Sequence, residues 1–109
     1  MERLNTETLS RFLGQPGVAA VMFGAPTGKA SMDQAVQFAE AWLECHDDAN
    51  FGYVDAFTNV AAARTYSVRV LPTTMIFADG EPIAWIEGRY ASTRIAQAIH
   101  NAARVPMAA

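Results

Sequence analysis

The loop Gly24–Ser31 carries the residue types that most invite a chemical interpretation, because it places a Gly-Lys pair between an apolar run and a helical pattern. Glycine-containing loops with this pair cradle phosphate groups in nucleotide-binding proteins. Here three residues separate the glycines instead of four, and Ala30 follows Lys29 where serine or threonine would bind magnesium. The sequence therefore disfavours nucleotide hydrolysis. Binding of an anion by Lys29 and the free amides at the start of the helix remains an open interpretation.

A second candidate is Cys45, the only cysteine of the chain, which is followed by His46 and two aspartates. Adjacent helix residues do not face each other, so Cys45 and His46 are not expected to pair as nucleophile and base. Cys45 shares a helical register with Phe38 and Trp42, which predicts a buried small apolar residue. His46 fits an exposed helix C-terminus, where its side chain interacts favourably with the helix dipole. His100 falls on the polar side of the last predicted helix, so we expect no metal site and no cofactor.

Ser31 and Gln34 form an S-x-x-Q pattern at the start of a long helical pattern. In such a capping box the serine side chain satisfies one free amide of the helix start and the glutamine side chain satisfies another. We therefore interpret Ser31 as a helix cap rather than a functional hydroxyl.

The amino-acid composition limits the classes of protein to which the chain can belong. The chain has 109 residues, of which 51% are hydrophobic and 17% charged, as expected for one compact globular domain. The net charge of −3 and the lack of a basic face argue against nucleic acid as a partner. No apolar run is long enough to span a membrane and no signal peptide is evident, so we expect a cytoplasmic protein and no membrane partner. One cysteine excludes an internal disulfide.

Hydrophobic periodicity and turn residues predict an α/β fold with the element order β-α-β-α-β-α-β-β-α and a central mixed sheet flanked by helices. The helices are expected after a cap at Asn5 or Thr6, over Ser31–His46, after Asn59 over Val60–Tyr66, and over Ser92–Arg104 with Ser92 as cap. The strands are expected around Arg3-Leu4, over Val18–Phe23, Phe51–Asp55 and Thr73–Phe77, and around Ile83–Glu87. We expect Met22, Phe38, Trp42, Ile76 and Ile99 to be buried and residues 105–109 to form a loose tail.

The stretch Tyr66–Gly88 organises the second half of the chain. Leu71-Pro72 precedes the apolar run that begins at Thr73, and Asp79-Gly80 is the strongest hairpin signal in the sequence. This succession resembles a thioredoxin domain, which has a proline, usually cis, before its third main strand, then a threonine, a glycine-containing turn and a glycine after the next strand. The resemblance covers nearly the whole chain. It implies a cis bond at Leu71-Pro72, which we expect to be exposed beside residues 27–30.

The thioredoxin resemblance also implies a Cys-x-x-Cys pair at the start of the long helix, where the helix end lowers a thiol pKa. Counted from the strand Val18–Phe23, that pair falls at Gly28 and Ser31, and neither is cysteine. The buried carboxylate of the family falls at Met22, and its helix proline falls at Val36. Each departure removes a part of the dithiol reaction, so we expect no dithiol oxidoreductase activity.

In thioredoxins a target peptide lies in a groove formed by the loop before the long helix, the proline segment and the glycine turn after the hairpin. The backbone beside such a proline can pair with an extended peptide as an added strand. We expect Leu71 to supply an apolar contact and Lys29 and Arg89 to flank it with positive charge. Carried over position by position, the groove residues are Thr27, Lys29, Ala30, Leu71, Pro72, Thr73, Gly88 and Arg89.

These observations predict a redox-inactive protein that binds another protein or an extended peptide segment. Thioredoxin-like proteins without the cysteine pair include assembly accessory proteins, such as chaperones of hydrogenase precursors, and the similarity to them is one of fold and missing cysteines only. The alternative is a thiol-dependent oxidoreductase or redox-homeostasis role through Cys45.

Overall fold

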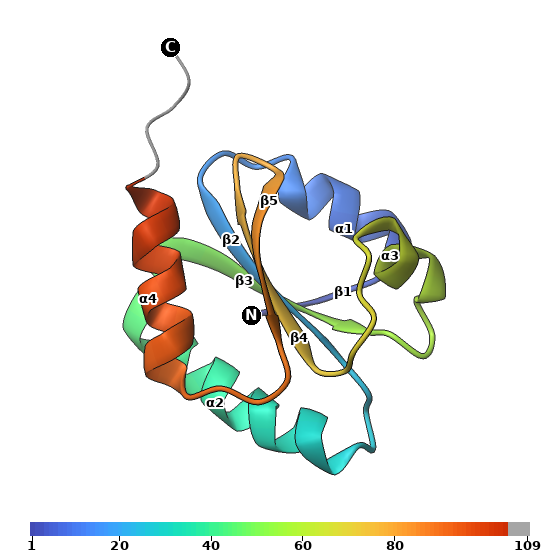
Figure 1. Ribbon diagram of the computed structural model, residues 1–109. Coiled ribbons are helices and arrows are strands. Elements are labelled where there is room, and N and C mark those ends of the chain that lie inside the picture. Colours follow the sequence, from blue (N-terminus) through green and yellow to red (C-terminus); the bar gives the residue numbers. More distant parts are fainter. Residues whose placement is uncertain (105–109) are drawn as a thin grey trace.

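The computed structural model describes residues 1–104, so the tail expected at 105–109 lies outside the described residues. The elements follow the predicted order, which is confirmed (Figure 1). They are β1 (Glu2–Leu4), α1 (Thr6–Leu13), β2 (Val18–Gly24), α2 (Lys29–Cys45), β3 (Ala49–Asp55), α3 (Val60–Thr65), β4 (Thr73–Ala78), β5 (Glu81–Glu87) and α4 (Ser92–Ala103).

The five strands form one mixed sheet in the order β1-β3-β2-β4-β5. The strands β1, β3 and β2 are parallel, whereas β4 runs antiparallel to β2 and β5 antiparallel to β4. Every residue of the central strand β2 is buried, as expected for a continuous apolar strand covered on both faces. Thr73 pairs with Phe23 on one side and with Glu87 on the other. This register brings the end of β2, the start of β4 and the end of β5 together at one end of the sheet.

Two helical layers cover the sheet, with α2 and α4 on one face and α1 and α3 on the other (Figure 1). The predicted core residues Met22, Phe38, Ile76 and Ile99 are each at most 1% exposed. Trp42 was expected to be buried but is half-buried at the border of the core, with its ring 5.1 Å from that of His46. The inward side of α2 is formed instead by Ser31, Gln34, Phe38, Ala41 and Cys45.

The hairpin between β4 and β5 is closed by Asp79-Gly80, as predicted. Both residues have positive φ angles, 49° and 84°, which this dipeptide tolerates because glycine has no Cβ and aspartate accepts the left-handed region. The Asp79 carboxylate accepts a hydrogen bond from the Gly17 N–H at 2.8 Å. The turn is thereby tied to the loop that leads into β2.

The helix ends follow the predicted caps only in part. The Asn5 side chain accepts from the Glu7 and Thr8 N–H groups and forms a capping box with Thr8. Asn59 and Ser92 make no side-chain cap contacts, so these two predictions are wrong. The Asn59 amide oxygen instead accepts from the Thr6 N–H, which links the start of α3 to the start of α1.

Within residues 1–104, none of the helices combines the length and the apolar character needed to cross a membrane.

The burial of β4 generates a stability prediction. Ile76 is 0% exposed at the centre of the sheet, so Ile76→Ala should lower the free energy of unfolding by about 2–5 kcal/mol. Ile83 on the edge strand β5 is 41% exposed, so Ile83→Ala serves as the matched control and should change stability by less than about 0.5 kcal/mol. Denaturant unfolding measures both values. Equal losses for the two variants would contradict the described burial of β4.

Candidate functional site

The start of α2 occupies the position at which the thioredoxin resemblance places a dithiol. Gly28 is the N-cap of α2 with extended backbone and no side-chain cap contact. The prediction that Ser31 caps the helix is wrong, because the helix begins two residues earlier, at Lys29. Ser31 is buried, and its hydroxyl accepts a hydrogen bond from the Ala25 N–H at 2.9 Å. This serine therefore fastens the preceding loop to the helix.

The proline segment lies beside the glycine turn. The Leu71-Pro72 peptide bond is cis, and the Gly88 N–H donates a hydrogen bond to the Pro72 carbonyl at 2.8 Å. Gly88 has a φ of +95°, which glycine adopts without the steric cost of a side chain. Pro72 was expected to be exposed, and this is wrong: its ring is buried, because the strands on both sides of β4 enclose the residues at its start. Thr73 is also buried, and its hydroxyl donates to the Val70 carbonyl at 2.6 Å.

Leu71 is the accessible part of this segment. Its side chain is half-buried against the core layer beneath α1 and α3. Within residues 1–104, neither its N–H nor its carbonyl forms a hydrogen bond with another part of the chain. Backbone groups of this kind normally find a partner in the protein or in water. Leu71 therefore presents a free donor and acceptor directly before β4.

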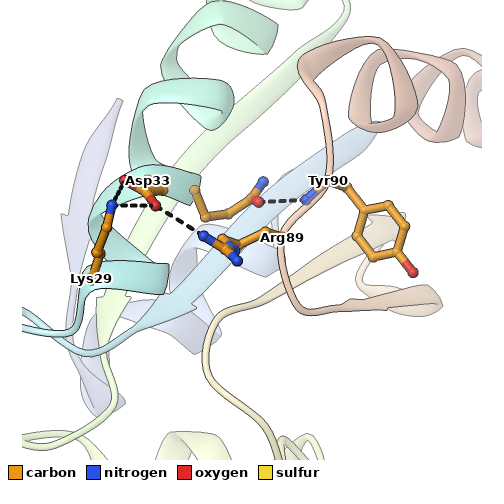
Figure 2. A network of polar contacts seen from close by, with 5 residues as sticks. Lys29, Asp33, Arg89 and Tyr90 are labelled. Carbon is orange, nitrogen blue, oxygen red and sulfur yellow. Dashed lines mark hydrogen bonds and ion pairs between the residues drawn. The ribbon is translucent and has the colours of Figure 1, made fainter.

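A three-residue ionic network joins α2 to the turn after β5. Asp33 lies between Lys29 and Arg89, with its Oδ2 atom 3.0 Å from Lys29 Nζ and 3.1 Å from an Arg89 guanidinium nitrogen (Figure 2). Hydrogen bonding from Lys29 is the largest influence that lowers the pKa of Asp33, so the carboxylate is ionised at neutral pH. Lys29 and Arg89 were expected to act as two flanking positive charges. Because they share one carboxylate, the three side chains together carry a net charge of about +1.

Two glutamines of α2 complete this connection. Gln34 was predicted to belong to a capping box with Ser31, which is wrong, and the sequence analysis did not identify Gln37. Gln34 accepts from the Tyr90 N–H at 2.7 Å, and Gln37 accepts from the Ser92 N–H at 2.9 Å (the first contact appears in Figure 2). Gln34 is 1% exposed although it is polar. Its position on the inward side of a helix, one turn after Ser31, was the sequence signal that something other than an apolar contact was needed there.

The predicted groove residues are thus brought together in two linked groups. Lys29 and Arg89 meet through Asp33, while Pro72 and Gly88 meet through a backbone hydrogen bond. Ala30 is half-buried, and Thr27 is exposed in the loop before α2 with no contact to the other groove residues among the described hydrogen bonds. A surface hollow lies beside the network and is lined by Asp33, Gln34, Gln37, Arg89, Tyr90 and Ala91.

Cys45 lies at the opposite end of α2 and is buried, as predicted. Burial, reinforced by the carboxylates of Glu44 and Asp48, raises the pKa of its thiol to about 11. Its Sγ atom lies 3.7 Å from His100 Nε2, a contact that sequence analysis did not foresee because the two residues are 55 positions apart. A thiol with this pKa is almost entirely protonated at neutral pH and is a poor nucleophile.

Known structures resemble this fold closely. Thioredoxin from Fasciola hepatica superposes with a TM-score of 0.82 at 24% sequence identity, covering 93% of this chain and 98% of the other. The Malassezia sympodialis thioredoxin Mala s 13 gives a TM-score of 0.84 at 18% identity, covering 94% and 90% of the two chains. Chloroplastic thioredoxin z gives 0.82 at 18% identity, covering 94% and 93%. At these identities the similarity establishes the fold alone.

Among curated protein sequences none matches this chain. The family model for thioredoxin, in contrast, matches residues 4–101, which run from the last residue of β1 through most of α4. This match agrees with the element order and with the proline, threonine and glycine positions around β4 and β5. The chain therefore belongs to the thioredoxin family, as a member with a single cysteine outside the dithiol position.

Proposed function

We propose that this protein is a redox-inactive member of the thioredoxin family that binds an extended segment of another protein in the groove beside Leu71 and Pro72. The observation that carries this proposal is the free backbone of Leu71. Its N–H and carbonyl lack partners within residues 1–104, and the segment lies at the end of the sheet where β2 and β5 end and β4 begins. An extended peptide can supply the missing partners by pairing as an added strand.

The surroundings of Leu71 favour a peptide with apolar side chains and a modest negative charge. Val70 and Tyr90, next to the two groove segments, are 44% and 46% exposed. The network of Lys29, Asp33 and Arg89 contributes net positive charge on the other side of the groove. Because surface charge influences selectivity and the rate of encounter more than affinity, the apolar contacts should supply most of the binding energy.

The groups present at the dithiol position support a role without disulfide exchange. Gly28 has no side chain, and the Ser31 hydroxyl is buried and already bound to the Ala25 N–H. A hydroxyl does not exchange with disulfides, since that reaction requires a thiolate nucleophile. An accessory function in the assembly or protection of a partner protein needs only the groove and is compatible with these residues.

The first prediction concerns disulfide reduction. The protein should reduce insulin disulfides no faster than its Cys45→Ala variant in the presence of any thiol reductant, because Gly28 and Ser31 replace the dithiol. The double variant Gly28→Cys/Ser31→Cys should gain little, since Met22 is buried where the family has its carboxylate. Turnover by the native chain above the Cys45→Ala control would disprove the absence of dithiol-type activity.

The second prediction concerns peptide binding in the groove. Peptides that bind the native chain are first selected from a displayed random library. Leu71→Ser should weaken binding of the selected peptides about 10-fold, since losing about 1.4 kcal/mol of apolar contact corresponds to that factor. Leu43→Ser is the matched control, because Leu43 is 68% exposed on α2 and is not a groove residue. Thermal melts establish that both variants remain folded.

A second measurement separates strand pairing from side-chain binding. Methylation of the one peptide amide that faces the Leu71 carbonyl should abolish binding, because it removes the donor of the added strand. Full affinity for Leu71→Ser in the folded state, together with tolerance of methylation at every amide, would move the binding surface away from this groove.

The alternative role through Cys45 receives less support. A pKa of about 11, compared with the ordinary 9.0, leaves about 100-fold less thiolate at neutral pH. In the presence of a chelator, iodoacetamide should therefore modify the native protein about 100-fold more slowly than the chain unfolded in guanidinium, in which the single thiol is free. Equal modification rates in the folded and unfolded states would support a thiol-based function for Cys45.

A further inference from the structure

The end of α2 and the last turns of α4 bring together a set of potential metal ligands that the groove does not use. Cys45 and Glu44 come from α2, and His100 comes from α4. The ligand atoms Cys45 Sγ, Glu44 Oε and His100 Nε2 all lie within 4.8 Å of one another. Thiolate, carboxylate and imidazole are the three ligand types that zinc accepts in proteins.

The spacing of these atoms fits a tetrahedral ion. With Zn–S bonds of about 2.3 Å and Zn–N bonds of about 2.0 Å, a tetrahedral site places sulfur and nitrogen about 3.5 Å apart. The structure has 3.7 Å between Cys45 Sγ and His100 Nε2, and 3.7 Å between Cys45 Sγ and Glu44 Oε2. These two separations need adjustments of a few tenths of an ångström. The third, between Glu44 and His100, is within 4.8 Å, so the exposed Glu44 side chain would move by up to about 1.5 Å to approach the tetrahedral spacing of about 3.3 Å.

A fourth potential ligand lies near His100, outside the cluster of the other three. Asp48 Oδ2 lies 3.9 Å from His100 Nε2, although that residue belongs to the turn after α2. Glu44 and Asp48 also surround the thiol with negative charge, which makes this position favourable for a cation. Glu44, Asp48 and His100 are exposed while Cys45 is buried, so an ion can reach the thiol from the surface through its other ligands.

The same geometry disfavours a catalytic Cys-His-Asp arrangement. In a triad the nucleophile and the carboxylate contact different nitrogens of the imidazole ring. Here both Cys45 Sγ and Asp48 Oδ2 approach the same atom, Nε2 of His100. A shared metal ion requires instead that several donor atoms lie close to one another, as those of Cys45, Glu44 and His100 do.

We propose that Cys45, His100 and Glu44 bind one zinc ion, with the Asp48 carboxylate as the fourth ligand. The ion would join the end of α2 to α4 and so stabilise the layer that these helices form over the sheet. α2 is 17 residues long, which separates this site from the groove by about 25 Å along the helix. Zinc binding is accordingly independent of the proposed peptide binding, and each can be lost without the other.

The test is zinc titration of the full chain by competition with a chromophoric chelator. His100→Gln and Glu44→Gln change exposed side chains and should each weaken binding about 10-fold or more, since changes even in groups outside the ligand set have effects of this size. His46→Gln and Glu40→Gln are the matched controls from the same helix end, and they should leave the affinity unchanged. Zinc, unlike magnesium, should raise the melting temperature of the native chain and of both controls.

Cobalt(II) substitution reports the sulfur ligand directly. The native chain should show an intense ultraviolet thiolate-to-cobalt charge-transfer band and visible bands typical of tetrahedral coordination, and Cys45→Ala should lose the charge-transfer band. A stoichiometry of one ion per chain with this spectrum would support the site. Equal weakening by His46→Gln and His100→Gln, or a cobalt complex without the thiolate band in the folded native chain, would overturn the proposal.

Discussion

The complete burial of β2 is the constraint on which the rest of this molecule depends. Seven consecutive buried residues require a helical layer on each face and a hydrogen-bonded strand on each side. The neighbouring strands β3 and β4 meet that need with opposite directions. As a result the loop that leaves β2 for α2 lies beside the start of β4 and the end of β5. The sheet topology therefore brings the residues of the proposed groove together without the need for a dithiol.

At that end of the sheet the chain has polar contacts where thioredoxin chemistry would need a reactive pair. Ser31 holds the loop, Asp33 joins Lys29 to Arg89, and Gln34 and Gln37 receive backbone N–H groups of the segment after β5. Exposed ion pairs contribute little to stability, so the network mainly sets the position of the Arg89 side chain. The glutamine contacts are more sheltered and fix the backbone of the turn. Together these contacts hold the turn after β5 against α2, next to the groove that we propose at Leu71 and Pro72.

The two ends of α2 thus have different characters. Near its start, Lys29 and Asp33 join the ionic network with Arg89, on the side of the proposed groove. Its last turn contributes Glu44 and Cys45 to a cluster with His100 whose ligand atoms face one another. Burial is the main cause of the raised pKa of Cys45, and the carboxylates of Glu44 and Asp48 add to it.

Local sequence determined much of the fold. The apolar run Val18–Phe23, the Asp79-Gly80 turn and the helical spacing of Phe38 and Cys45 each have one favourable local conformation, so the element order followed from them. The absence of a dithiol was likewise readable, because residue identities at Gly28 and Ser31 decide it. These features need no knowledge of distant contacts.

The tertiary structure decided where residues far apart in the chain meet. Pairing of β4 on both sides buried Pro72, and packing of α4 against α2 placed His100 beside Cys45. The Ser31 hydroxyl accepts from the Ala25 N–H of the loop and does not cap the helix. The buried Gln34 side chain accepts from the Tyr90 N–H in the turn after β5. Each outcome depends on a contact partner that periodicity along the sequence does not specify, and such partners are set only when the layers assemble around β2.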